Sequence, residues 1–112
     1  MIIEKKIIEY LKPLLSVDVL AESPEDESLP YVRIERVGRT IKNHITTDSV
    51  AFQSYGRTML EAADLDEEVQ ELMKGIVSLD EISRISLQSN YNASDTSRMK
   101  YRYQCIYDIV YI

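Results

Sequence analysis

The sequence contains few of the residues on which metal, disulfide and phosphate-binding chemistry depends. Its 112 residues include one cysteine, Cys105, and one histidine, His44. A single cysteine excludes an internal disulfide, and a single histidine removes most zinc constellations. Three glycines, Gly38, Gly56 and Gly75, lie far apart, and none opens a G-x-G-x-x-G or G-x-x-x-x-G-K loop. We therefore expect no metal, no cofactor and no enzymatic activity.

The chain also lacks an excess of basic residues and any long hydrophobic run. It has 13 Lys and Arg against 19 Asp and Glu, a formal net charge of −6. A duplex-binding surface needs clustered cations to displace the counterions of phosphate, so this balance argues against one. No apolar run approaches the ~18 residues of a membrane span. The sequence predicts a soluble protein of a reducing compartment without a membrane partner.

Two amphipathic segments predict helices. In the first, Ile3, Ile7, Leu11 and Leu14 share one face, and Pro13 ends or kinks the last turn.

The second helix begins at Thr58, which has the spacing of a capping box with Glu61, and it ends near Gly75. Its buried stripe is predicted to contain Ala62, Leu65, Val69, Leu72, Met73 and Ile76. The acidic residues 61–68 are interpreted as a solvated helix start rather than as a metal site.

Alternating apolar and polar residues predict five strands, over 17–22, 31–37, 49–55, 85–91 and 99–112. The acidic stretch 23–28 is predicted to be a surface loop, and a single helical turn is allowed near residues 77–81. The segment 38–48 is either a long connection or a protruding hairpin arm. The order of elements predicts one α+β domain over residues 1–112, with two helices packed on a largely antiparallel or mixed sheet.

Tyrosine is the unusual constituent, with eight residues and no tryptophan. Tyr101, Tyr103, Tyr107 and Tyr111 lie on one face of the last predicted strand, where Cys105 is a buried or half-buried hydrophobe. Such a face packs under helices, forms a protein–protein contact or stacks single-stranded bases, and all three interpretations remain open.

The order of segments resembles that of a known family. Residues 29–38 read LPYVRIERVG, residues 47–56 read TDSVAFQSYG, the second predicted helix contains Glu61-Ala62-Ala63-Asp64, and residues 98–112 close the chain as an apolar strand. This pattern is similar to that of the tail terminator proteins of long-tailed bacteriophages, also called tail completion or head–tail joining proteins. Arg39 departs from it, because many relatives have a second glycine there.

The resemblance implies a structural virion protein at the tail–head junction, present in the host cytoplasm before assembly. Such proteins form a ring, commonly a hexamer, on the end of the tail tube and stop its polymerisation. The implied partners are further copies of the chain, the tail tube protein and a head-completion or connector protein, while duplex DNA passes through without specific binding. Arg36, Arg39, Lys42 and His44 are then the candidate contacts to a subunit or to the tube.

A second function class remains open beside the structural one. The chain is alternatively a small intracellular binding module that uses its tyrosine-rich sheet face for a ligand or for single-stranded nucleic acid. Strongly salt-dependent binding of oligonucleotides would favour this alternative.

Overall fold

The computed structural model describes residues 1–26 and 28–112, so Glu27 of the predicted acidic loop lies outside the described residues. The elements are α1 (Ile3–Leu11), β1 (Asp18–Leu20), β2 (Tyr31–Lys42), β3 (Ile45–Gly56), α2 (Met59–Met73), the short 3-10 helix η1 (Ile76–Ser78), β4 (Ile82–Asn92), the 3-10 helix η2 (Thr96–Arg98) and β5 (Tyr101–Tyr111).

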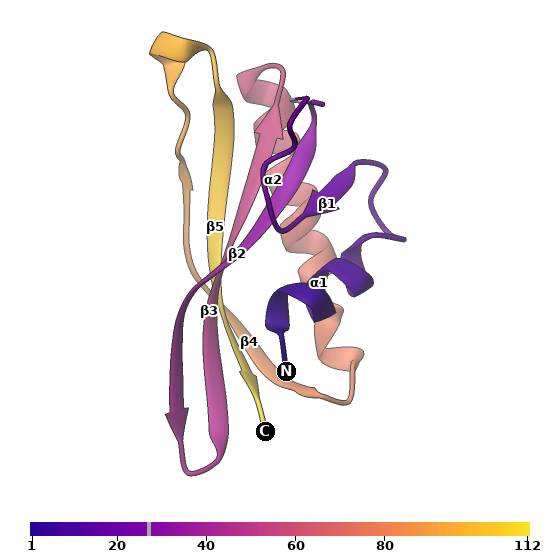
Figure 1. Cartoon of the computed structure of the whole chain (residues 1–112), viewed down its shortest axis with the longest axis vertical. Helices are drawn as coiled ribbons and strands as arrows, with labels where there is room; N and C mark the ends of the chain where they lie inside the picture. Colours follow the sequence, from indigo (N-terminus) through magenta and orange to yellow (C-terminus); the bar gives the residue numbers. More distant parts are fainter. Residues whose placement is uncertain (27) are drawn as a thin grey trace.

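The five strands form one sheet in the order β1-β2-β3-β5-β4, in which β1 is parallel to β2 and the other pairs are antiparallel. Both helices lie on the same side of this sheet (Figure 1). The predicted α+β class is therefore confirmed.

The first helix is shorter than its hydrophobic pattern predicts. Ile3, Ile7 and Leu11 are buried as expected, but α1 ends at Leu11, before Pro13. Beyond that end the helical spacing no longer applies, so the placement of Leu14 on the buried face is wrong: its side chain is 48% exposed. Leu15 is buried in its place.

The second helix begins where the capping signal predicts. Thr58 is the N-cap, and its hydroxyl accepts a hydrogen bond from the Glu61 amide at 3.1 Å. The Glu61 carboxylate reaches back one residue further than in a capping box and accepts from the Arg57 amide at 2.7 Å. Gly56 precedes this turn, and a Cβ there would lie 2.5 Å from the Ala62 nitrogen, so only glycine fits.

Most of the predicted stripe on this helix is buried. Ala62, Leu65, Val69 and Met73 are covered by the sheet, Ile76 is buried on η1, and Leu72 is half-buried. The helical turn allowed near residues 77–81 exists as η1 but lies slightly earlier in the chain.

The segment 38–48 is the outer half of a continuous β-hairpin, so of its two interpretations the hairpin arm is confirmed and the long connection is wrong. Cross-strand pairing runs without interruption from Gly38 and Ser49 to Lys42 and Ile45. Asn43 and His44 have positive φ angles of 51° and 65°, as a two-residue hairpin turn requires. The strands continue through this polar segment because each outer residue still has a backbone partner.

None of the helices in the described part of the chain is long and apolar enough to span a membrane.

Candidate functional site: a hairpin arm and a tyrosine cleft

The arm, residues 38–48, carries apolar side chains that the domain does not cover. Ile41 is 64% exposed and Ile45 is 44% exposed, and Val37 beside the β2 bulge is 53% exposed. The turn residues of the arm extend past both chain ends (Figure 1). Lys42 and His44 are exposed near this tip. The arm therefore offers apolar and basic groups together at one end of the molecule.

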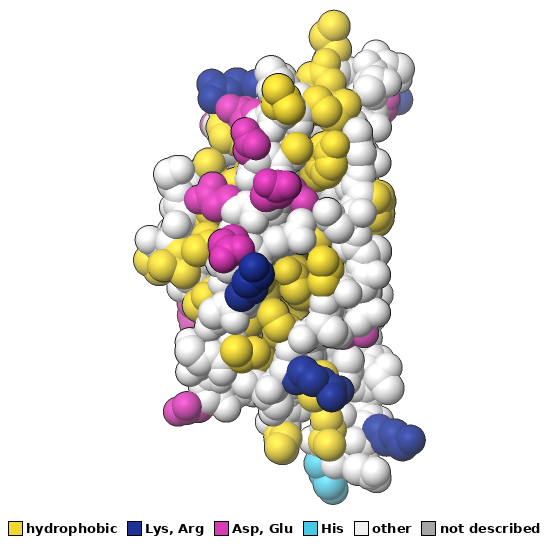
Figure 2. Space-filling view, turned by 180° about the vertical axis from the view of Figure 1, so that it is seen from behind, with side chains coloured by type: hydrophobic (Ala, Val, Ile, Leu, Met, Phe, Trp, Pro, Cys, Tyr) yellow, Lys and Arg dark blue, Asp and Glu magenta, His cyan; other side chains and the backbone are white. Residues whose placement is uncertain are grey.

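The two chain ends lie beside this arm. The Met1 carbonyl accepts a hydrogen bond from Arg39 at 3.3 Å, and Tyr111, the residue before Ile112, is paired with Thr46 of the arm. Figure 2 shows hydrophobic and basic side chains and the single histidine gathered at this end. Together the exposed apolar residues make an arm surface, which consists of Met1, Ile2, Val37, Ile41, Ile45 and Ile112.

An ion pair between a buried carboxylate and an exposed arginine holds the base of the arm. Asp48 of β3 is completely buried, and its carboxylate accepts two hydrogen bonds from the Arg39 guanidinium, at 2.7 and 3.1 Å. The Tyr111 hydroxyl donates to the same carboxylate at 2.6 Å and accepts from Arg39 at 2.8 Å. This bidentate geometry fixes the arm to β5 and to the N-terminal carbonyl.

The charges at the arm base divide the four candidate contact residues into two pairs. Burial raises the pKa of Asp48, but the hydrogen bonds from Arg39 and Tyr111 and the nearby charge of Arg36 outweigh it, so this pKa lies below its ordinary value. Arg39 and Arg36 thus compensate a charge within their own chain. Lys42 and His44 lie on the exposed part of the arm.

The four tyrosines of β5 lie on the face of the sheet that the helices cover, and burial divides them. Tyr107 and Tyr111 are 5% and 4% exposed, and Tyr107 packs edge-on against Phe52 with ring centroids 5.5 Å apart. Tyr101 and Tyr103 are half-buried. The two inner tyrosines are core residues, in keeping with the first of the three interpretations.

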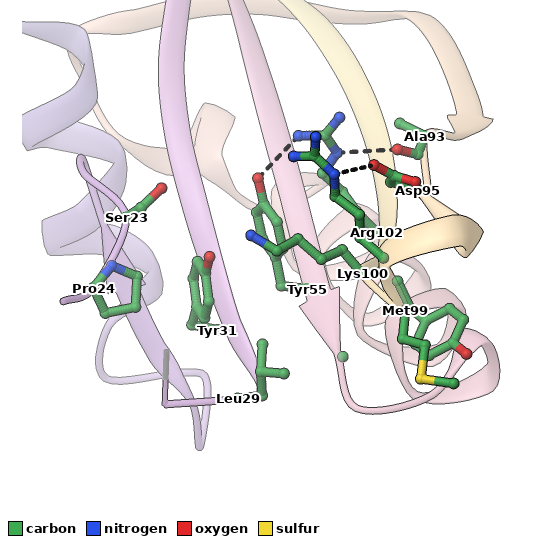
Figure 3. Close-up of a pocket in the computed structure, with 13 residues that line it drawn as sticks. Ser23, Pro24, Leu29, Tyr31, Tyr55, Ala93, Asp95, Met99, Lys100 and Arg102 are labelled. Atoms are coloured by element: carbon green, nitrogen blue, oxygen red, sulfur yellow. Dashed lines mark hydrogen bonds and ion pairs between the residues drawn. The ribbon is translucent and has the colours of Figure 1, made fainter. Parts of the chain in front are cut away.

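A different pair of tyrosines, which sequence reasoning missed, lines a cleft on the uncovered face. Tyr31 of β2 and Tyr55 of β3 are cross-strand partners, and their rings stack with centroids 4.6 Å apart. Arg102 of β5 lies over the Tyr55 ring at 5.6 Å and donates to its hydroxyl at 3.0 Å. The cleft has a volume of about 390 Å³, and its lining includes Arg98 and Lys100 from the β4–β5 connection. Figure 3 shows Lys100 beside Tyr55 and Arg102. Cross-strand pairing is the signal that would have predicted the contact between Tyr31 and Tyr55, but it can be used only once the strand register is known.

The Tyr55 ring has no face free for a ligand. Its strand lies between β2 and β5, so Tyr31 covers one side of the ring and Arg102 the other (Figure 3). Stacking of nucleobases needs an open aromatic face. The chemistry that the cleft offers is therefore cationic, from Arg98, Lys100 and Arg102, with Asp95 as the acidic side chain among its lining residues.

Polar side chains connect the strands across the middle of the uncovered face. Arg33 donates to the Gln53 side chain at 2.9 Å, and Gln53 donates to Gln104 at 2.9 Å. Arg33 also pairs with Glu35 at 3.1 Å. These bonds extend from β2 across β3 to β5, so this face presents ordered polar groups rather than an apolar layer.

One acidic residue of α2 contradicts the interpretation of residues 61–68 as a solvated helix start. Asp66 is 2% exposed, and its carboxylate accepts hydrogen bonds from Gln70 and Asn90, each at 2.8 Å. Burial raises the pKa of Asp66, although these bonds oppose the shift. Burial, with the nearby Asp66 charge, also raises the pKa of the Cys105 thiol, which keeps it protonated and unreactive.

Among residues 1–26 and 28–112, no group of three His, Cys, Asp or Glu side chains is placed to hold a metal ion. Comparison with known proteins adds no assignment, because no protein-family model matches the chain and no curated protein matches it.

Proposed function

We propose that this protein is a structural virion subunit of a long-tailed phage or prophage, without catalytic activity. It forms a ring at the head-proximal end of the tail tube, terminates tail polymerisation and provides the surface that joins the head. The resemblance of its segments to tail terminator proteins supports this proposal, and so does the small α+β domain. The ring is expected to contain six copies.

The observation that carries the proposal is the arm with its uncovered apolar side chains. Exposed apolar groups gathered on a small domain mark protein–protein contacts, and six of them occur at the arm end of this molecule, on both faces of the hairpin. Because Arg39, Asp48 and Tyr111 fix the base of the arm, less conformational entropy is lost when it binds a neighbour. The arm thus suits contact with an adjacent subunit or with the tail tube.

The acidic character of the chain also fits a conduit for DNA. With a net charge of −6, the protein repels phosphate on average, so DNA could pass through a ring without adhering. The alternative, a module that binds single-stranded nucleic acid, has less support because Tyr107 and Tyr111 of the predicted tyrosine face are buried and the rings of Tyr31 and Tyr55 are covered.

The test shortens the arm without changing its register. Removing Ile41, Lys42, Ile45 and Thr46 joins Thr40 and Thr47, which are cross-strand partners, through the natural Asn43-His44 turn. We expect the shortened protein to fold, as judged by circular dichroism, but to form no rings in light scattering and negative-stain electron microscopy and to fail to cap tails.

A matched control replaces an exposed apolar residue far from the arm. Leu60 at the start of α2 is 76% exposed, and Leu60→Gln removes an exposed apolar side chain while leaving the arm intact. This variant should assemble as the wild type does. Normal rings and capped tails with the shortened arm would contradict the proposed role.

A further inference from the structure

The cleft beside Tyr31 and Tyr55 and the outer surface of α2 carry opposite charge. Arg98, Lys100 and Arg102 line the cleft with Asp95. The outer surface of α2 forms a shallow groove whose charged lining residues are Asp64, Glu67, Glu68, Glu71 and Lys74. Figure 2 shows acidic side chains gathered on this side of the molecule. A net basic surface and a net acidic one therefore occur in the same chain.

These two surfaces lie on opposite faces of the sheet. The buried residues of α2 pack in one core with Phe52 and Cys105, which places the helix on their face. Tyr55 and Arg102 are each an odd number of positions from those residues along the same strands, so they point to the other face. No single copy can bring its own α2 into its own cleft.

We infer that the cleft receives the acidic outer surface of α2 from a second copy of this chain. The contact is heterologous, because the α2 surface of one copy binds the cleft of the next copy. Repeated contacts of this type close into rings. This inference rests on the proposed ring function and specifies which surfaces meet. Charge complementarity selects the partner, since Glu67 and Glu68 are exposed and Arg98 is 77% exposed at its side chain.

The covered tyrosine rings favour this occupant over single-stranded nucleic acid. Tyr31 is 6% exposed and Tyr55 lies between two neighbours, so neither ring of this stacked pair offers an open face to a base. A carboxylate needs only the guanidinium and ammonium groups at the cleft rim. Arg98 is one of these groups, and its partner in the same chain, Asp95, is 3.6 Å away and 48% exposed, so both remain accessible to a neighbour.

The test reverses the charge of the cleft and of the α2 surface in two separate variants, and then mixes the two variants. One variant carries Arg98→Glu and Lys100→Glu, and the other carries Glu67→Lys and Glu68→Lys. We expect each alone to associate at least ~10-fold more weakly than the wild type, because like charges then face each other across the contact. An equimolar mixture should regain assembly, because the acidic α2 of the first variant fits the basic cleft of the second and the reversed surfaces fit each other.

The restored assembly has a composition that native mass spectrometry can recognise. Copies of the two variants must alternate, so the mixed ring contains equal numbers of each. The control variant, Lys5→Glu with Lys12→Glu, changes the charge by the same amount on α1 and its C-cap, and both positions lie outside the two surfaces. It should associate as the wild type does. Association of the wild type should weaken as salt is added.

Three results would overturn the inference. They are a wild type that stays monomeric at its highest soluble concentration in low salt, folded single variants that assemble normally, and folded variants whose mixture does not assemble. Salt-dependent binding of a short oligothymidylate that Arg98→Glu and Lys100→Glu abolish would assign the cleft to nucleic acid instead. If the shortened arm prevents ring formation while the charge variants assemble normally, the ring function stands and this contact alone is wrong.

Discussion

Asp48 and Asp66 are both buried on the helix-covered side of the sheet, and their surroundings differ in one respect. Asp48 faces a guanidinium and a phenol, whereas Asp66 faces two amides and a thiol. The pKa of Asp48 consequently lies below its ordinary value, and burial keeps that of Asp66 above its ordinary value. A full positive charge compensates the burial of a carboxylate, and neutral donors compensate it only in part.

The difference assigns distinct roles to the two regions. At the arm base, the ion pair stabilises the folded state when Asp48 is charged, which is the condition at neutral pH. In the middle of α2, the ionised form of Asp66 costs stability at the same pH. The arm is therefore fixed most firmly at neutral pH. The contact between α2 and β4, in contrast, is more stable when Asp66 is protonated.

The largest expected effect comes from removing the cation at the arm base. Arg39→Met leaves the buried Asp48 without its bidentate partner, and we expect the free energy of unfolding to fall by more than in any other variant described here. Urea denaturation at pH 7 measures this change. Arg36→Met is the matched control, because Arg36 is exposed and contributes charge at a distance, so its loss should cost about 0.5 kcal/mol or less. Equal losses in the two variants would contradict the role of the bidentate pair.

In acid, Arg39→Met should become as stable as the wild type. The pKa of Asp48 is lower in the folded than in the unfolded protein, so its contribution is present above about pH 4, the unfolded value, and disappears as pH falls through the folded pKa. The difference in unfolding free energy between the wild type and Arg39→Met should therefore shrink as the pH is lowered from 7 to below 4. A difference that is constant with pH would show that the variant acts through packing.

A smaller effect is expected from the phenol. Tyr111→Phe removes one hydrogen bond to Asp48 and keeps the ring in the core, so the unfolding free energy should fall by about 1 kcal/mol. Thermal and urea denaturation both measure it. Combined with Arg39→Met, the loss should differ from the sum of the two single losses, because both groups bind one carboxylate. Strict additivity would argue against a shared network.

The smallest effect is expected at Asp66. Asp66→Asn keeps an oxygen that can accept from Gln70 and Asn90, so unfolding free energy at pH 7 should stay within about 1 kcal/mol of the wild type. Because the folded pKa of Asp66 is raised, the wild type loses stability as pH rises from about 4 through that pKa, and the variant does not. The unfolding free energy of Asp66→Asn should therefore increase relative to that of the wild type as pH rises. A relative decrease would contradict the raised pKa.

Local sequence patterns predicted most of the fold because hydrophobic period and caps act within a few residues. The N-cap at Thr58 and the buried positions Ile3, Ile7 and Leu11 follow from spacing alone. Leu14 was misplaced because the helix period was extended past a proline-induced end. For the segment 38–48 the sequence left a hairpin arm and a long connection both open, since Asn43-His44 is a weaker hairpin signal than Asn-Gly.

The sequence by itself determined the α+β class, the burial of the helix stripes, the acidic charge and the absence of common catalytic motifs, because these depend on composition and short-range periodicity. Only the tertiary structure decided which charges meet. Arg39 reaches Asp48 and Tyr111 across three strands, and Tyr31 stacks on Tyr55 under the side chain of Arg102. Tyr111 lies 72 residues from Arg39 and 63 from Asp48 in the chain. Strand order and register bring them together, because every contact across a sheet depends on how each strand aligns with its neighbour.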